Sequence, residues 1–229
     1  MPTIWNDLLR LFYPNLCVIC KKPLVEGEDQ ICLKCLCDLP HTGYHKRVDN
    51  PAEQRFAGKI RIEQGSAFLL FEKGGATQCL IHALKYRENK ELGFLLGRQA
   101  GHELLANQSP LCQADLLIPI PLHPRKQRKR GYNQSEWIAD GISSALGIPV
   151  RTDCVSRLIP NSSQVRRSVY ERWLNTCSIF KTTHPEALEN KHVILIDDVI
   201  TTGATITACA EALQAVPGIR ISVFSLSIT

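Results

Sequence analysis

The chain has 229 residues, of which 44% are hydrophobic and 21% are charged. This composition is typical of a globular protein with a hydrophobic core and argues against a disordered chain. No apolar run approaches the roughly 20 residues that cross a bilayer, which argues against a membrane-spanning protein. The net charge is only +5, but the run RKQRKR at 125–130 is almost entirely basic. This distribution predicts a local contact with an anionic partner rather than a generally basic surface.

The first segment, residues 1–16, does not have the pattern of a signal peptide. It lacks a basic leader, and Asp7 and Arg10 interrupt its apolar stretch. Its apolar residues recur at helical spacing, so we expect a short helix that packs on its own protein. A helix that binds a membrane surface or a partner is the alternative. Without an export signal we expect a cytoplasmic protein whose ten cysteines stay reduced.

Five cysteines fall between residues 17 and 37, four of them in the spacing C-x2-C-x11-C-x2-C. Two C-x-x-C turns offer four thiolates, which suits the tetrahedral preference of zinc. So short a segment buries too little apolar surface to fold alone, so a metal would stabilise it. We expect structural Zn²⁺ bound by Cys17, Cys20, Cys32 and Cys35. Cys37 could replace Cys35, and reduced cysteines or a redox pair without metal are the alternative.

The rest of the chain follows an α/β pattern. In chain order, the sequence predicts a strand at 65–71, two helices within 75–107 broken near 87–90, a strand within 114–123, a basic loop at 125–129, a helix at 133–147, a strand at 192–197, a helix at 204–216 and a strand at 219–228. Short apolar strands that alternate with helices favour a parallel sheet covered on both faces. We expect two domains, a zinc-binding module at 1–45 and an α/β domain at 46–229.

The stretch VILIDDVITTGAT at 193–205 combines a strand, two acids and a threonine-rich turn into a helix. Helix N-termini bind anions through free amides, and ligands of open α/β sheets lie beyond the carboxyl ends of the strands. Neither a Walker lysine nor a G-x-G-x-x-G fingerprint is present. Acids that accept from vicinal hydroxyls, next to a phosphate loop, fit a ribose 5-phosphate. We expect the hydroxyls on Asp197 and Asp198 and the phosphate on Thr201, Thr202, Gly203, Ala204 and Thr205.

This stretch resembles the 5-phosphoribosyl 1-diphosphate (PRPP) binding signature of type I phosphoribosyltransferases. The resemblance implies that fold, a parallel sheet flanked by helices. It also implies that Mg²⁺ binds with PRPP and that diphosphate leaves C1 of the ribose before a nucleophile attacks. Asp197 and Asp198 would be the catalytic residues, which orient the ribose and stabilise the positive charge that develops on it.

Three further segments, 84–93, 118–139 and 156–180, together with the four cysteines, resemble the ComF (ComFC/GntX-like) family over nearly the whole chain. Asn161 and Arg167 depart from the pattern, where threonine and leucine are common. The resemblance implies a PRPP-binding, phosphoribosyltransferase-like protein of natural competence and transformation that handles single-stranded DNA after uptake, with other competence proteins as further candidate partners. A metabolic phosphoribosyltransferase with a small acceptor, or a non-catalytic PRPP sensor or adaptor, is the alternative, so whether the protein is an enzyme stays open.

Other polar residues in these segments are candidates for the same ligand or for DNA. Candidates for substrate or diphosphate are Lys85, Arg130, Gly131, Asn133, Gln134, Gln164 and Arg172. Candidates for nucleic acid are Arg125, Lys126, Arg128 and Lys129; a solvated basic loop is the alternative. We expect the segment 156–180 to close over the ligand, or else to form a surface helix. His82 and His123 are predicted to be structural.

Overall fold

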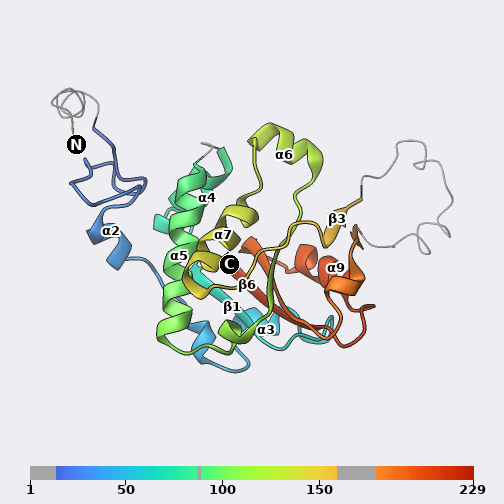
Figure 1. Ribbon diagram of the computed structural model, residues 1–229. Coiled ribbons are helices and arrows are strands. Elements are labelled where there is room, and N and C mark those ends of the chain that lie inside the picture. Colours follow the sequence, from blue (N-terminus) through green and yellow to red (C-terminus); the bar gives the residue numbers. More distant parts are fainter. Residues whose placement is uncertain (1–13, 87–88, 159–178) are drawn as a thin grey trace.

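The computed structural model describes residues 14–86, 89–158 and 179–229 (Figure 1). The expected N-terminal helix and most of the expected closing segment 156–180 lie outside these residues. So do the candidate ligand contacts Gln164 and Arg172.

A parallel sheet of four strands forms the centre of the protein. Its spatial order is β1 (Gly65–Leu70), β6 (Arg220–Ile228), β5 (His192–Ile200) and β2 (Leu116–Pro119). All three pairings are parallel, so all four carboxyl ends lie at one edge. The predicted α/β fold with a parallel sheet is confirmed.

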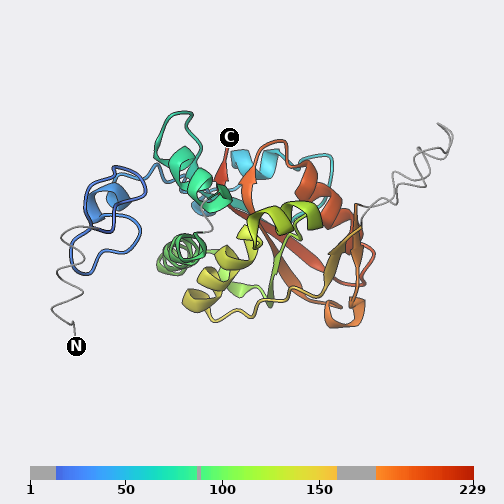
Figure 2. The ribbon, with the colours of Figure 1, turned by 90° about the horizontal axis from the view of Figure 1, so that it is seen from above.

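Helices cover both faces of this sheet (Figures 1 and 2). On one face lie α4 (Ala76–Tyr86), α5 (Lys90–Ala106) and α7 (Gln134–Leu146), and on the other lies α9 (Ala204–Leu213). Strand β5 shows why: Ile194 and Ile196 belong to the α5/α7 core, whereas Val193 and Leu195 belong to the α9 core. Successive side chains of a strand point to opposite faces, so an uninterrupted apolar run buries both.

The predicted helices and strands are found with small shifts at their ends. The two helices in 75–107 are α4 and α5, and α7 ends at Gly147, whose φ of 72° is left-handed. Strand β5 continues through the two acids to Ile200 rather than ending at residue 197, because its last residues still pair with β6. In the described ranges, no helix is both long and apolar enough to cross a membrane.

Residues 125–129, expected as a loop, lie in a helix, α6 (Pro124–Arg130). The His123 side chain caps its first turn, proline occupies the first helical position, and Gly131 ends it with φ 74°. The structure also contains an antiparallel pair that the sequence did not predict, β3 (Val155–Arg157) with β4 (Phe180–Thr182). The shorter elements are α2 (Leu33–Cys37), η1 (Tyr44–Lys46), α3 (Pro51–Gln54), η2 (Pro110–Gln113) and η4 (Pro185–Ala187).

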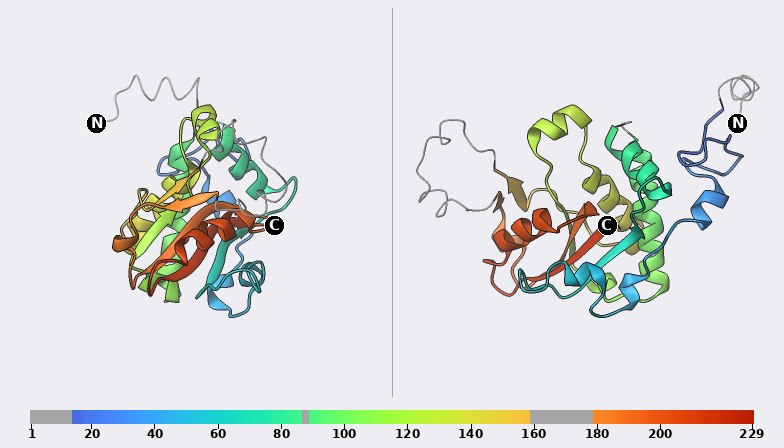
Figure 3. Two further views of the ribbon diagram at one scale, coloured as in Figure 1. Left: turned by 90° about the vertical axis from the view of Figure 1, so that its right-hand side faces the viewer. Right: turned by 180° about the vertical axis from the view of Figure 1, so that it is seen from behind.

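The cysteine module, residues 14–39, lies beside α4 and α5 (Figure 3). Its buried Val18 and Ile31 belong to the same core as Leu80 and Leu84 of α4. The Asn89 side chain also donates to Gln30 Oε1 over 2.7 Å. The chain then reaches the sheet, where His41 pairs with Leu69 of β1. The module is therefore packed on the α/β part rather than attached by a free linker.

Candidate functional site

A cavity of about 530 Å³ opens at the carboxyl edge of the sheet. It is lined by residues of α4, α6, α7, β3, β5 and the turn before α9. Among its lining residues are these predicted site residues: Lys85, Lys126, Arg130, Gln134, Asp197, Asp198, Thr201 and Thr205. The structure thus gathers residues from four distant segments of the chain at one place.

The cavity exists because β2 stops before β5 does. The last hydrogen bond between them is donated by Ile120 N to Ile196 O over 2.9 Å. Proline has no amide hydrogen to extend such a ladder, and Pro119 and Pro121 flank this point. Asp197 and Asp198 follow directly, still paired with β6 on one side. The acids therefore lie where β5 has lost its β2 neighbour and a ligand has room.

The two acids have different surroundings. Asp198 Oδ2 forms an ion pair with Lys85 Nζ over 3.0 Å. Asp197 Oδ1 accepts from the Asp198 amide over 2.9 Å and from Ser135 Oγ over 3.4 Å. Burial, and then the neighbouring charge of Asp198, raise the pKa of Asp197 to about 7. One carboxylate is thus neutralised by a lysine, while the other sits where negative charge is unfavourable.

The threonine loop has the backbone shape of an anion site. Gly203 adopts φ 78°, and a Cβ on it would lie 2.9 Å from Cε1 of the buried Phe56, so no larger residue fits. Gly203 is also the N-cap residue of α9, and it has no side chain that could accept from the first amides of this helix. Amides at a helix N-terminus that lack such a partner can bind an anion. Thr201 and Thr205 line the cavity. Thr202 is exposed, and its Oγ1 accepts from the Ala204 amide over 3.4 Å.

The basic residues of helix α6 fall into two groups, one that lines the cavity and one on the outer surface. Lys126 and Arg130, one turn apart, line the cavity, and Arg130 Nη1 donates to Gln134 Oε1 over 2.8 Å. Arg125, Arg128 and Lys129 are exposed and are not among the lining residues. The basic run therefore supplies two charges to the site and three to the outer surface.

Among the described residues, five predicted ligand contacts do not line this cavity: Thr202, Gly203, Ala204, Gly131 and Asn133. Gly131 is exposed at the end of α6. Asn133 is buried; its Nδ2 donates to Ile120 O over 3.1 Å, and its Oδ1 accepts from the Ser135 amide over 3.2 Å. Asn133 thus ties the start of α7 to the backbone that follows β2.

Two polar lining residues, Ser135 and Thr229, were not predicted from the sequence, and Arg157 was expected only as part of the segment 156–180. Ser135 directly follows the candidate pair 133–134 at the start of α7, and this adjacency was the available signal. Arg157 begins the motif in the segment 156–180, but the resemblance gave it no role; the structure places it on β3, where it lines the cavity.

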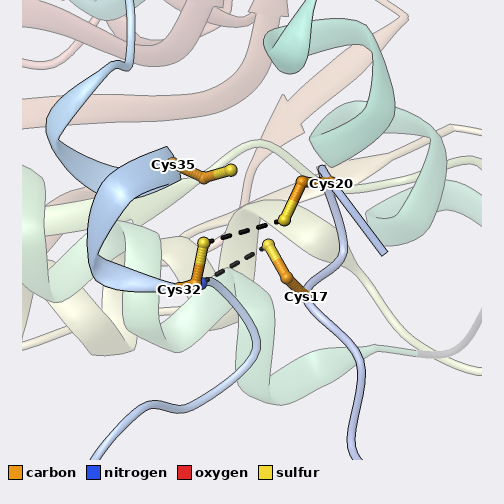
Figure 4. A group of neighbouring side chains, drawn as sticks. All are labelled: Cys17, Cys20, Cys32 and Cys35. Carbon is orange, nitrogen blue, oxygen red and sulfur yellow. Dashed lines mark hydrogen bonds between the residues drawn. The ribbon is translucent and has the colours of Figure 1, made fainter. Parts of the chain in front are cut away.

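The four predicted zinc ligands form one cluster (Figure 4). The sulfur atoms of Cys17, Cys20, Cys32 and Cys35 all lie within 4.8 Å of one another, and Cys20 Sγ is 3.7 Å from Cys32 Sγ. Four thiolates at 2.3 Å from a tetrahedral zinc would be about 3.8 Å apart, so the cluster fits that ion. Cys37 is exposed and outside the cluster, which favours Cys35 as the fourth ligand.

The environment of Cys17 also suits a metal ligand. Burial opposes ionisation of its thiol, but hydrogen bonds from backbone amides, Cys32 first, outweigh burial and lower its pKa to about 6. One of these bonds, Cys32 N to Cys17 Sγ, measures 3.4 Å. Amides that point at a sulfur stabilise the thiolate, the form that binds metal.

The chain is similar in sequence to proteins named for DNA utilization and competence. No family model matches the chain. The chain is 27% identical over 222 residues to "DNA utilization protein YhgH" of Escherichia coli (strain K12), covering 89% of this chain and 92% of that protein. It is 31% identical over 114 residues to "Competence protein F" of Haemophilus influenzae, covering 49% and 50% of the two chains. It is 35% identical over 98 residues to "Competence protein ComFC" of Bacillus subtilis, covering 43% and 38%.

Among solved structures, the chain is similar to the glutamine PRPP amidotransferase of B. subtilis, with 19% identity and a TM-score of 0.40 over 62% of this chain and 26% of that one. It is also similar to a purine phosphoribosyltransferase of Pyrococcus horikoshii, with 16% identity and a TM-score of 0.36 over 58% and 83%.

The sequence similarities, the four-cysteine cluster and the parallel sheet with its acidic strand end and threonine loop together support a ComF-like protein with the type I phosphoribosyltransferase fold.

Proposed function

We propose that the protein binds PRPP in the cavity at the carboxyl edge of the sheet and acts in the handling of single-stranded DNA. One observation carries the first part: two adjacent acids, a threonine loop at a helix N-terminus and several cations line a single cavity. The acids suit ribose hydroxyls, whereas the loop and the cations suit phosphates.

In this proposal, different cavity residues bind different parts of PRPP. Asp197 and Asp198 accept from the 2- and 3-hydroxyls, and the loop 201–205 binds the 5-phosphate. Lys126 and Arg130 reach toward the diphosphate. Mg²⁺ bound with PRPP would neutralise part of the diphosphate charge. Lys85 holds Asp198 Oδ2 at 3.0 Å and so fixes this carboxylate, whose Oδ1 is left to accept a hydroxyl.

Calorimetric titration with PRPP and Mg²⁺ tests the binding claim. The wild type should bind, and Asp197→Asn/Asp198→Asn should bind at least about 10-fold more weakly, since both charged acceptors are lost. Glu186→Gln/Glu189→Gln, which removes two exposed carboxylates elsewhere, is the matched control. Wild-type PRPP affinity in the double asparagine variant would reject the assignment of the acids.

Turnover needs a separate measurement, because a sensor and an enzyme both bind PRPP. Diphosphate release should be followed with candidate acceptors, including nucleobases and single-stranded DNA. If diphosphate is released by the wild type but not by Asp197→Asn/Asp198→Asn, the protein is a transferase. The acceptor that supports this release then shows whether the transferase is metabolic. Tight binding with no release under any condition supports the sensor.

The DNA part of the proposal rests on the relatives' names and on α6. YhgH is named as a DNA utilization protein, and two relatives are named as competence proteins. Three cations of α6 face outward, next to the two that line the cavity. A single strand can follow such a surface by its phosphates, and each contact adds to the salt dependence of binding.

Electrophoretic mobility shifts with single-stranded DNA at several salt concentrations test this. Neutralising Arg125, Arg128 and Lys129 to glutamine should weaken binding and lower the slope against log salt by about 2, since a single-strand contact contributes roughly 0.7. Neutralising Lys59, Arg61 and Arg220, exposed at the opposite edge of the sheet, removes the same charge without touching α6. Equal effects of the two triple variants would reject α6 as the contact.

A further inference from the structure

Arg157 is a cation of the cavity that belongs to the motif of the segment 156–180 but has no role in the proposed function. It lies at the end of β3 and lines the cavity together with the acids and the threonines. Figures 1 and 3 show β3 and α4 on opposite sides of α6. Arg157 and Lys85 therefore reach the cavity from different elements, β3 and α4.

The side chain of Arg157 packs against the aromatic ring of Phe180. Its Cζ lies 5.2 Å from the ring centroid of Phe180, its direct partner across the β3–β4 pair. Phe180 is completely buried, so this ring is a fixed platform. A guanidinium over an aromatic face is attracted to the ring and loses little further freedom when it binds.

The hydrogen-bonding capacity of Arg157 is not met by the protein. Its Nε is buried, and it finds no hydrogen-bond partner within the ranges that the structure describes. A buried donor without a partner is unfavourable, so such an atom in a cavity wall indicates a missing acceptor. The cavity acids do not supply it: Asp198 pairs with Lys85, and Asp197 accepts from Ser135 and from the Asp198 amide.

We propose that Arg157 is a phosphate-binding residue of this cavity, a guanidinium preset by Phe180 to bind one phosphate group of the ligand. The planar fork matches phosphate oxygens in pairs, which the ammonium groups of Lys85 and Lys126 cannot do. The inference rests on the proposed function for the identity of the ligand. The phosphate is either the 5-phosphate or the diphosphate, and the two can be separated by experiment.

Calorimetry with inorganic diphosphate and with ribose 5-phosphate, each titrated alone, tests the assignment. Arg157→Gln should weaken binding of at least one of the two by about 10-fold or more, and the ligand affected identifies the phosphate. Arg157→Lys keeps the charge but loses the fork and should recover only part of the affinity. Arg151→Gln is the matched control, because Arg151 pairs with the exposed Asp153 and does not line the cavity. Circular dichroism confirms that each variant is folded.

The outcomes separate this inference from the proposed function. Wild-type affinity of Arg157→Gln for both ligands overturns the role of Arg157 even if PRPP binds. Arg157-dependent binding of diphosphate without any binding of PRPP supports Arg157 and overturns the proposed function. Failure of the wild type to bind either ligand overturns both.

Discussion

The Asp197 carboxyl is held where its charge is unfavourable. Burial first, and Asp198 second, raise its pKa from 3.8 to about 7. Between these pH values the folded protein binds more protons at this group than the unfolded chain does. The free energy of unfolding therefore falls as pH rises through this range, and the full cost is present above pH 7. Such a group gives up stability, which fits a residue placed for a ligand rather than for the fold.

Replacing Asp197 should therefore stabilise the empty protein in a pH-dependent way. Asp197→Asn keeps an oxygen that accepts from the Asp198 amide and removes the charge. We expect a gain of about 1–2 kcal/mol in the free energy of unfolding at pH 8 and almost none near pH 4, where Asp197 is protonated anyway. Urea denaturation at both pH values measures this. Glu189→Gln, at an exposed carboxylate, should show no such difference, and an equal gain at both pH values would contradict the buried charge as its cause.

The spacing of residues indicated the part of the site that lies in one stretch, whereas Lys85, Arg130 and Gln134 were expected only from segments that resemble the family. The acids and threonines are contiguous, so their spacing alone indicated a sugar phosphate. The ion pair of Asp198 with Lys85 joins β5 to α4, and Arg157 arrives from β3. These segments meet at one edge because of the order of the strands in the sheet. That order depends on the whole fold and cannot be predicted from any one segment.

At the level of elements, α5 and α7 pack unusually closely. A Cβ on Gly141 of α7 would lie 2.2 Å from the Phe94 carbonyl oxygen, and one on Gly97 of α5 would lie 2.2 Å from that of Ile138. These atoms belong to helix backbones, which cannot move aside separately. The glycines thus set the distance between the two helices, and α7 in turn holds Ser135 against Asp197.

A methyl group at this contact should separate the helices. Gly141→Ala should lower the free energy of unfolding by about 2–4 kcal/mol, although alanine is the better helix former by roughly 1 kcal/mol. Ser144→Ala, at an exposed position of the same helix, is the control: it removes the hydroxyl that donates to the Gly141 carbonyl over 2.7 Å but adds no atom between the helices, so it should cost about 1 kcal/mol or less. Chemical denaturation measures both, and a more stable Gly141→Ala variant would refute the backbone contact.

Helix α6 shows why an element with clear end signals was expected to be a loop. Its seven residues, PRKQRKR, contain no apolar period, and periodicity was the basis of every helix prediction. Its ends define it instead: His123 as cap, proline at the first position and Gly131 after the last. The apolar strands were easier to predict, because burial on both faces leaves a continuous hydrophobic run.

The cysteine cluster includes Cys35 but not the nearby Cys37. We propose that it holds one structural Zn²⁺. Cys35→Ser should lose most of the bound zinc and lower the melting temperature, because it removes one of four clustered thiolates. Cys37→Ser, two residues away and outside the cluster, should keep one zinc per chain. Metal analysis of both purified variants decides, and equal zinc contents would contradict this ligand set.

At the scale of the whole molecule, the cysteine module and the ligand cavity meet at helix α4. The module shares its core with Leu80 and Leu84, on the buried side of this helix. Near its end, α4 carries Lys85, which pairs with Asp198 in the cavity. A change in the module can therefore reach the site through one rigid element, without any contact between metal and ligand.

Removal of the metal should consequently affect both stability and binding. A zinc chelator should lower a single melting transition of the whole protein, and it should weaken PRPP binding by a few-fold, because α4 no longer holds Lys85 in place. Lys85→Gln provides the decisive comparison. If the effect travels through α4, chelation should weaken PRPP binding less in this variant than in the wild type, since the residue that it displaces is already absent. An equal loss in both proteins would contradict the path through Lys85, and separate melting of the two parts with unchanged PRPP binding would show that the module is independent of the site.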